Sequence, residues 1–86
     1  MTRAETPTDG QVVDQVLAGQ QAAYRLLVER HQQAVFNAAY RLLGTQEEAA
    51  DIAQDTFLRA YQALDRFEQD RPLAPWLCRI ASNLIF

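Results

Sequence analysis

Two stretches decide the fold: TQEEAADIAQDTFLRAYQAL (residues 45–64) and, after a short charged link, PLAPWLCRIASN (residues 72–83). In both, apolar residues recur at spacings of three and four, which is the period of an amphipathic helix. Thr45 and Glu48 have the spacing of a capping box, and Pro72 or Pro75 suits the first turn of a helix. The two stretches therefore predict helices over residues 46–64 and 74–86.

The same helical period continues toward the N-terminus over residues 10–18 and 21–43. Gly19 and Gly44 stand where these two helices should end in left-handed caps. No segment alternates with the period of two that a half-buried strand requires. We therefore predict an all-α fold, a compact bundle of about four helices (10–18, 21–43, 46–64 and 74–86) with an ordered loop before the last helix. The predicted core stripes comprise Val12, Val13, Val16, Leu17, Tyr24, Leu27, Val28, His31, Val35, Ala38, Ala39, Leu42, Ala49, Ile52, Ala53, Thr56, Phe57, Ala60, Leu64, Trp76, Leu77, Ile80, Ala81 and Leu84.

The chain has 86 residues, enough for one domain with one core. We assign residues 1–8 to an N-terminal tail and residues 9–86 to the helical domain. The last predicted helix reaches Phe86 without a glycine, asparagine or proline to end it. The chain is therefore expected to be a fragment of a longer, two-domain protein.

The composition limits the functional classes. No apolar run approaches the roughly 20 residues that span a bilayer, and the N-terminus lacks the apolar stretch of a secretory signal. Cys78 is the only cysteine, which excludes a disulfide framework and a cysteine metal cluster within one chain. A cytoplasmic protein is expected. The net charge of −3, with arginine as the only basic residue besides one histidine, is unusual for a nucleic-acid-binding protein.

No catalytic constellation stands out in the sequence. His31 is the only histidine, and its place on the apolar stripe of residues 21–43 predicts a core or partly buried side chain. Asp51 and Asp55 lie one helical turn apart, where a solvated face or an interface is favoured over a cation site. We predict no enzyme activity, no cofactor, no metal and no small-molecule substrate.

The outward face of the helix predicted over residues 46–64 has a composition that fits two interpretations. At 100° per residue, an apolar side chain is surrounded there by acids and amides: Asp51, Gln54, Asp55, Leu58 and Gln62. One exposed leucine is ordinary on any protein surface. The same arrangement, an apolar anchor with a polar rim, is also typical of a partner-docking face.

The last predicted helix presents Arg79, Ser82 and Asn83 opposite its core stripe. These residue types suit nucleic acid, because arginine reaches phosphates or base edges and asparagine and serine hydrogen-bond to base edges. Periodicity alone favours an ordinary solvated helix face.

The motifs D-x-x-Q-D-x-F (residues 51–57) and W-L-x-R-I-A-x-N (residues 76–83) together are far more specific. In this order they resemble region 2, the promoter-melting domain, of bacterial extracytoplasmic-function sigma factors, and the resemblance covers roughly residues 9–86. It implies that the outward face of residues 46–64 docks on the β′ clamp coiled coil of core RNA polymerase. It also implies that the last helix and the loop of residues 65–74 capture the −10 promoter element as single-stranded DNA. Arg66, Phe67 and Arg71 are then the loop's expected DNA contacts, and an anti-sigma factor is a possible further partner.

The alternative is a helical adaptor, a degenerate sigma-like module that binds proteins without a DNA role. The net charge favours this alternative, whereas Arg79, Asn83 and the loop arginines favour DNA.

Overall fold

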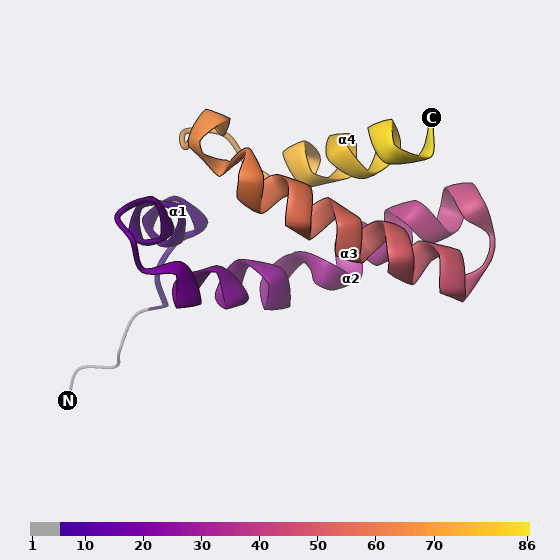
Figure 1. Cartoon of the computed structure of the whole chain (residues 1–86), viewed down its shortest axis with the longest axis horizontal. Coiled ribbons are helices and arrows are strands. Elements are labelled where there is room, and N and C mark those ends of the chain that lie inside the picture. The colour runs from indigo at the N-terminus through magenta and orange to yellow at the C-terminus, as the bar shows by residue number, and fades with distance from the viewer. Residues whose placement is uncertain (1–5) are drawn as a thin grey trace.

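The computed structural model describes residues 6–86 as helices and short connections, with no strand in that range (Figure 1). The predicted all-α bundle of four helices is confirmed. The N-terminal tail predicted over residues 1–8 falls largely outside the described residues. The helices are α1 (Asp9–Leu17), α2 (Tyr24–Leu43), α3 (Gln46–Gln62) and α4 (Leu73–Ile85), with 3-10 turns η1 (Gln21–Ala23) and η2 (Leu64–Arg66).

Two residues, Gly44 and Thr45, connect α2 to α3. Gly44 has φ of +82°, the left-handed conformation that glycine adopts without a steric penalty, and its N–H donates to the Tyr40 carbonyl at 2.8 Å. The Thr45 hydroxyl caps the next helix by accepting from the Glu48 N–H at 3.3 Å. The Glu48 carboxylate accepts from that hydroxyl at 2.9 Å, so only half of the predicted capping box forms.

A complete capping box occurs instead at Thr8, where the sequence analysis did not predict one. The Thr8 side chain accepts from the Gln11 N–H at 3.1 Å, and the Gln11 side chain accepts from the Thr8 N–H at 2.9 Å. This cap starts α1 at Asp9, one residue earlier than predicted. Pro72 occupies the N-cap position of α4 and Pro75 lies in its first turn, where a missing N–H costs no hydrogen bond.

The ends of two predicted helices tighten into 3-10 turns. Residues 21–23 form η1 before the α-helical part of the predicted helix 21–43 begins. Helix α3 ends at Gln62, and the chain continues through η2 into the loop. Such tightening at helix ends is common, because i to i+3 hydrogen bonds satisfy some of the terminal backbone groups.

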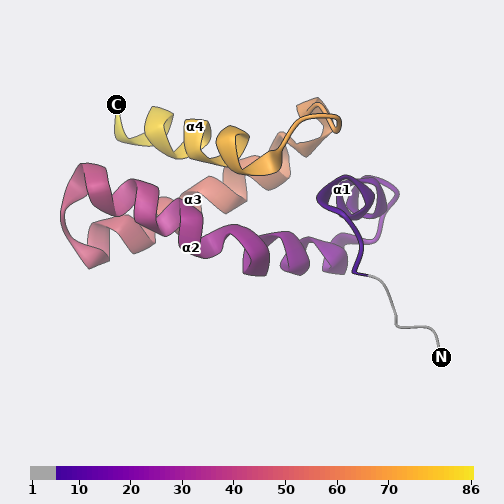
Figure 2. The ribbon, with the colours of Figure 1, turned by 180° about the vertical axis from the view of Figure 1, so that it is seen from behind.

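Helices α2, α3 and α4 each pack against the other two, and α1 lies across the N-terminal part of α2 (Figures 1 and 2). The only buried polar side chain among the described residues is Thr56, whose hydroxyl donates to the Ile52 carbonyl at 2.7 Å. All four helices and η2 contribute to one core cluster, which consists of Val12, Val13, Val16, Leu27, Val35, Phe57, Ala60, Leu64, Phe67, Leu73, Leu77 and Ala81.

The core stripes were predicted well, with two exceptions. Leu17 at the end of α1 and Leu42 in the last turn of α2 are exposed by 45% and 51%, respectively. Trp76 packs against the core cluster as predicted, and His31 is partly buried as predicted. No helix in the described part of the chain combines the length and apolar character needed to span a bilayer.

Tyr24 ties the start of α2 to the C-terminal half of α3. Its hydroxyl donates to the Phe57 carbonyl at 2.6 Å, and its ring meets the Tyr61 ring edge-on at a centroid distance of 5.1 Å. Burial, with a smaller contribution from Tyr61, raises the pKa of Tyr24 to about 12. The phenol therefore stays neutral and keeps this hydrogen bond across the neutral pH range.

Replacing Tyr24 with Phe should lower the free energy of unfolding by about 1 kcal/mol at neutral pH, because one partly buried hydrogen bond is lost. The pKa of Tyr24 is higher in the folded chain than the value of about 10 in the unfolded chain, so its contribution is complete below about pH 10 and is lost as pH rises toward 12. Urea denaturation should show a smaller difference in the free energy of unfolding between the wild-type and Tyr24→Phe proteins at about pH 10.5 than at about pH 8. A difference that does not change with pH would contradict this role of the phenol.

Candidate functional site

The outward face of α3 forms an exposed ridge of the five predicted docking residues: Asp51, Gln54, Asp55, Leu58 and Gln62. All five side chains are exposed, and Leu58 in their midst is 57% exposed. The 100° rotation per residue places this ridge opposite the side of α3 that buries Ala49, Thr56 and Ala60. The structure thus brings these predicted residues together on one surface without giving any of them a role in the core.

An apolar trough runs along one side of this ridge, between α2 and α3. It consists of two hollows of about 580 and 540 Å³ that share Phe57. Leu58 borders the first hollow and Gln54 the second. The remaining lining residues are Gln21, Ala22, Tyr24, Arg25 and Tyr61 in the first hollow, and Val28, Gln32, Gln33, Phe36, Ala50 and Ala53 in the second.

The helical periodicity of the sequence did not predict the trough, although one signal for it was present. Phe36, which lines the second hollow, lies outside the predicted core stripe of α2, and its ring stacks on that of Tyr40 beyond the trough at a centroid distance of 6.0 Å. Large aromatic side chains off the core stripe of a helix are evidence for a second apolar surface. The ridge and the trough together present acidic, amide and apolar groups. This combination suits a helix that carries basic and apolar side chains.

On α4, the predicted residues face away from the buried residues Leu77 and Ala81. Arg79 and Asn83 are exposed, and Ser82 between them is partly buried. These three side chains offer a cation, an amide and a hydroxyl on neighbouring positions of one helix, a set that can hydrogen-bond to phosphates and base edges.

In the loop before α4, the three predicted residues separate. Arg66 and Arg71 are exposed, and Arg71 Nε lies 2.7 Å from the Glu68 carboxylate. Phe67 is only 7% exposed and belongs to the core cluster, with its ring 5.0 Å from that of Trp76. The direct DNA contact predicted for Phe67 is at odds with this burial. Its ring anchors the loop, and the exposed arginines remain the loop's DNA-contact candidates.

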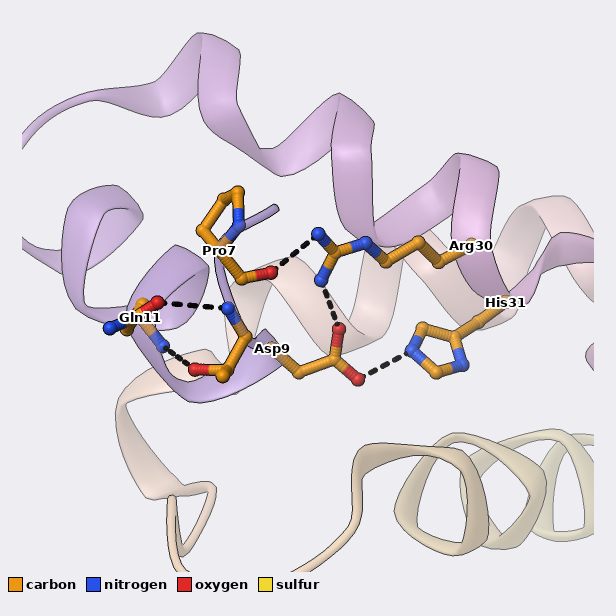
Figure 3. A network of polar contacts seen from close by, with 6 residues as sticks. Pro7, Asp9, Gln11, Arg30 and His31 are labelled. Carbon is orange, nitrogen blue, oxygen red and sulfur yellow. Dashed lines mark hydrogen bonds and ion pairs between the residues drawn. The ribbon is translucent and has the colours of Figure 1, made fainter. Parts of the chain in front are cut away.

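A polar network that joins α1 to α2 was not predicted either (Figure 3). The Asp9 carboxylate lies between two α2 side chains, accepting from Arg30 at 2.9 Å and from His31 Nε2 at 2.7 Å. Arg30 also donates to the Pro7 carbonyl. Partial burial acts to raise the pKa of Asp9, but the hydrogen bonds and charges of Arg30 and His31 outweigh it and hold this pKa below its usual value. Asp9 is 21 and 22 residues from its partners, too far apart for a local sequence pattern to reveal the contact.

No group of three or more histidine, cysteine, aspartate or glutamate side chains within residues 6–86 is arranged to hold a metal ion. Asp51 and Asp55 remain two exposed acids on the α3 ridge. The described surfaces offer charge, hydrogen-bonding groups and apolar contact for recognition.

Comparison with known proteins identifies the fold family. Residues 27–86 match the family model described as sigma-70 region 2. The chain belongs to the sigma-70 region 2 family. The NMR structure of an engineered region 2 of sigmaE in complex with GTAAAA matches this region 2 fold with a TM-score of 0.84 and 38% sequence identity. The match covers 94% of this chain and 84% of the other.

Curated relatives include extracytoplasmic-function (ECF) sigma factors, as the two motifs predicted. SigW of Bacillus subtilis is 42% identical over 72 residues, which cover 84% of this chain and 38% of the relative. The sigma-E factor of Escherichia coli K12 is 39% identical over 80 residues, which cover 93% of this chain and 41% of the relative. The chain therefore spans about two fifths of the length of these relatives.

The placement of Phe67 can be tested by its effect on folding. Phe67→Ala should lower the free energy of unfolding by about 3 kcal/mol, because it leaves a cavity beside Trp76. Arg66→Ala should change stability by less than about 0.5 kcal/mol, since the side chain is exposed. Urea denaturation followed by circular dichroism measures both. Equal, small effects would mean that the Phe67 ring lies outside the core.

Proposed function

We propose that this chain is the promoter-recognition and melting domain of an ECF sigma factor. The α3 ridge and the trough would dock on core RNA polymerase, while α4 and the preceding loop would capture the −10 element as single-stranded DNA. The observation that carries the proposal is the likeness in fold and sequence to a region 2 whose structure was solved with the single strand GTAAAA.

Docking on the polymerase is supported by the chemistry of the α3 surface. Asp51 and Asp55 place negative charge beside the exposed Leu58, and the apolar trough adjoins them. An acidic rim attracts a basic partner and speeds encounter, while an apolar anchor adds affinity once water is excluded. We assign the β′ clamp coiled coil as this partner because the resemblance to sigma region 2 implies it, and an apolar trough is compatible with a helical partner.

DNA capture is supported by Arg79, Ser82 and Asn83 on α4 and by Arg66 and Arg71 in the loop. Phosphate contacts fix the position of the strand, while amide and hydroxyl groups discriminate between bases. Extracting a base from the duplex costs a few kcal/mol, which contacts to the unstacked base must offset. Melting in this mechanism is capture of unpaired bases, without bond chemistry, a cofactor or a metal.

The remaining assignments follow from this role. We propose that the domain is not an enzyme and acts in the cytoplasm together with RNA polymerase. An anti-sigma factor that covers the docking or DNA surfaces is a proposed further partner. If polymerase binding is found without DNA binding, the helical-adaptor alternative is correct instead.

Charge reversal on the α3 ridge tests docking. Asp51→Arg and Asp55→Arg should each weaken binding to core RNA polymerase by about tenfold, or about 1.4 kcal/mol, since they place a positive charge against a basic partner. Asp14→Arg on α1 makes the same change in net charge away from the ridge and serves as the control. Affinity can be measured by fluorescence anisotropy of the labelled domain, with thermal melting to verify folding. Equal affinities for ridge and control variants would remove the docking assignment.

Single-strand binding tests the DNA surface. Asn83→Ala should weaken binding to GTAAAA by about tenfold, within the range of about 1–3 kcal/mol for a base-reading contact, and leave binding to the scrambled strand AATAGA nearly unchanged. Arg79→Ala should weaken both strands alike and reduce the salt dependence of binding, as expected for a phosphate contact. Fluorescence anisotropy at several salt concentrations separates the two effects. Equal losses on both strands for Asn83→Ala would show that this residue does not read bases.

A further inference from the structure

Helix α1 is fastened to α2 by polar contacts on one of its sides. Asp9 bonds to Arg30 and His31, and Arg30 reaches past it to the Pro7 carbonyl (Figure 3). The pKa of Asp9 is held below its usual value, so the carboxylate is charged at neutral pH and available for both bonds. We call the three side chains Asp9, Arg30 and His31 the α1 latch.

The other side of α1 contacts the segment that leads to α4. Val12, Val13 and Val16 share the core cluster with Leu64 of η2 and Phe67 of the loop. Gly10 approaches the loop backbone closely, since a Cβ atom there would lie 3.5 Å from the Gln69 carbonyl oxygen. Helix α1 therefore lies between α2 and the loop, as both ribbon views also show (Figures 1 and 2).

Few contacts hold the loop before α4 in place. Within the described part of the chain, the hydrogen bonds of Arg66, Phe67 and Arg71 to other residues are local, each reaching back three residues. Its tertiary anchors are the Phe67 ring, which lies against Trp76, and the contact with α1. The exposed arginines on either side of Phe67 thus take their positions from these two anchors.

We propose that the α1 latch positions the loop before α4, so that Asp9 is a positioning residue for DNA capture although it lies outside the DNA surface. The proposal rests on the proposed function. Its structural part, the coupling of Asp9 to the loop, can be tested without DNA. Trp76 is the only tryptophan in the chain, and its contact with Phe67 makes its fluorescence a reporter of loop position.

The first experiment compares Asp9→Asn with Asp14→Asn, the same chemical change at an exposed position of the same helix. Under conditions where both variants are fully folded, Asp9→Asn should increase acrylamide quenching of Trp76 and speed amide hydrogen exchange in residues 66–71. Arg30→Gln should do the same while keeping Asp9 and His31. Quenching and exchange rates that match those of Asp14→Asn in both latch variants would overturn the proposal.

The second experiment asks whether loop position matters for binding. Asp9→Asn should weaken binding to GTAAAA by about threefold to tenfold and leave the affinity for core RNA polymerase unchanged, because no latch side chain belongs to the α3 ridge or lines the trough. A GTAAAA affinity equal to that of Asp14→Asn, despite a displaced loop, would overturn the functional part. If the unmodified chain does not bind GTAAAA at all, the proposed function fails, while the fluorescence result still decides the coupling.

Gly10 provides an independent test from the loop side of α1. Gly10→Ala should leave Trp76 quenching and GTAAAA binding unchanged, because a Cβ atom at 3.5 Å from the Gln69 carbonyl is in ordinary contact. Gly10→Leu should push the loop outward and reproduce the Asp9→Asn effects with the latch intact. A Gly10→Leu chain that is folded and has a wild-type loop signal would contradict the close packing on which the proposal depends.

Discussion

The structure depends on the two-residue connection between α2 and α3. Gly44 and Thr45 end one helix and cap the next with no residue between them, so α2 and α3 must pack as antiparallel neighbours. Small side chains on the inner face of α3, such as Ala49 and Ala60, allow close approach. Once that face is buried, the helical period determines which residues of α3 face outward. The position of the α3 ridge is therefore a direct consequence of how the hairpin closes.

A chain of this size has little interior, and its helices must serve the core and the surface at once. Phe57 shows this sharing, because it is 7% exposed, belongs to the core cluster and still lines both hollows of the trough. The ridge acids Asp51 and Asp55, in contrast, are exposed, so reversing their charge should change stability little. Phe67 differs from the ridge acids, because it supports the loop through its packing in the core. Substitutions of Phe57 or Phe67 therefore change folding and binding together.

The sequence was sufficient for features that repeat locally. Helical periodicity predicted four helices and most of the core, and the positive φ angles of Gly19 and Gly44 agree with the predicted caps. The sequence was insufficient where contacts join distant residues. Nothing local connects Asp9 to Arg30 or Gly10 to the Gln69 carbonyl. The link DRFEQDR has no apolar period, so its one aromatic residue could not be assigned to the core rather than to the surface. The site residues on α3 and α4 came from motif resemblance, because periodicity alone allows an ordinary solvated face.

Because α1 is short, it needs tertiary contacts on two of its sides to hold its position. A helix of nine residues is marginal alone in water, so its place in the fold must come from contacts with the rest of the chain. The polar latch supplies orientation on the α2 side, while three valines supply burial on the side of the core. An element held in this way is also a support for whatever packs against it. A loop that is already in place loses less conformational entropy when it takes up a strand than a loose loop does. In the proposed melting of DNA by capture, no chemical step supplies free energy, so such preorganisation directly increases the binding that offsets base unstacking.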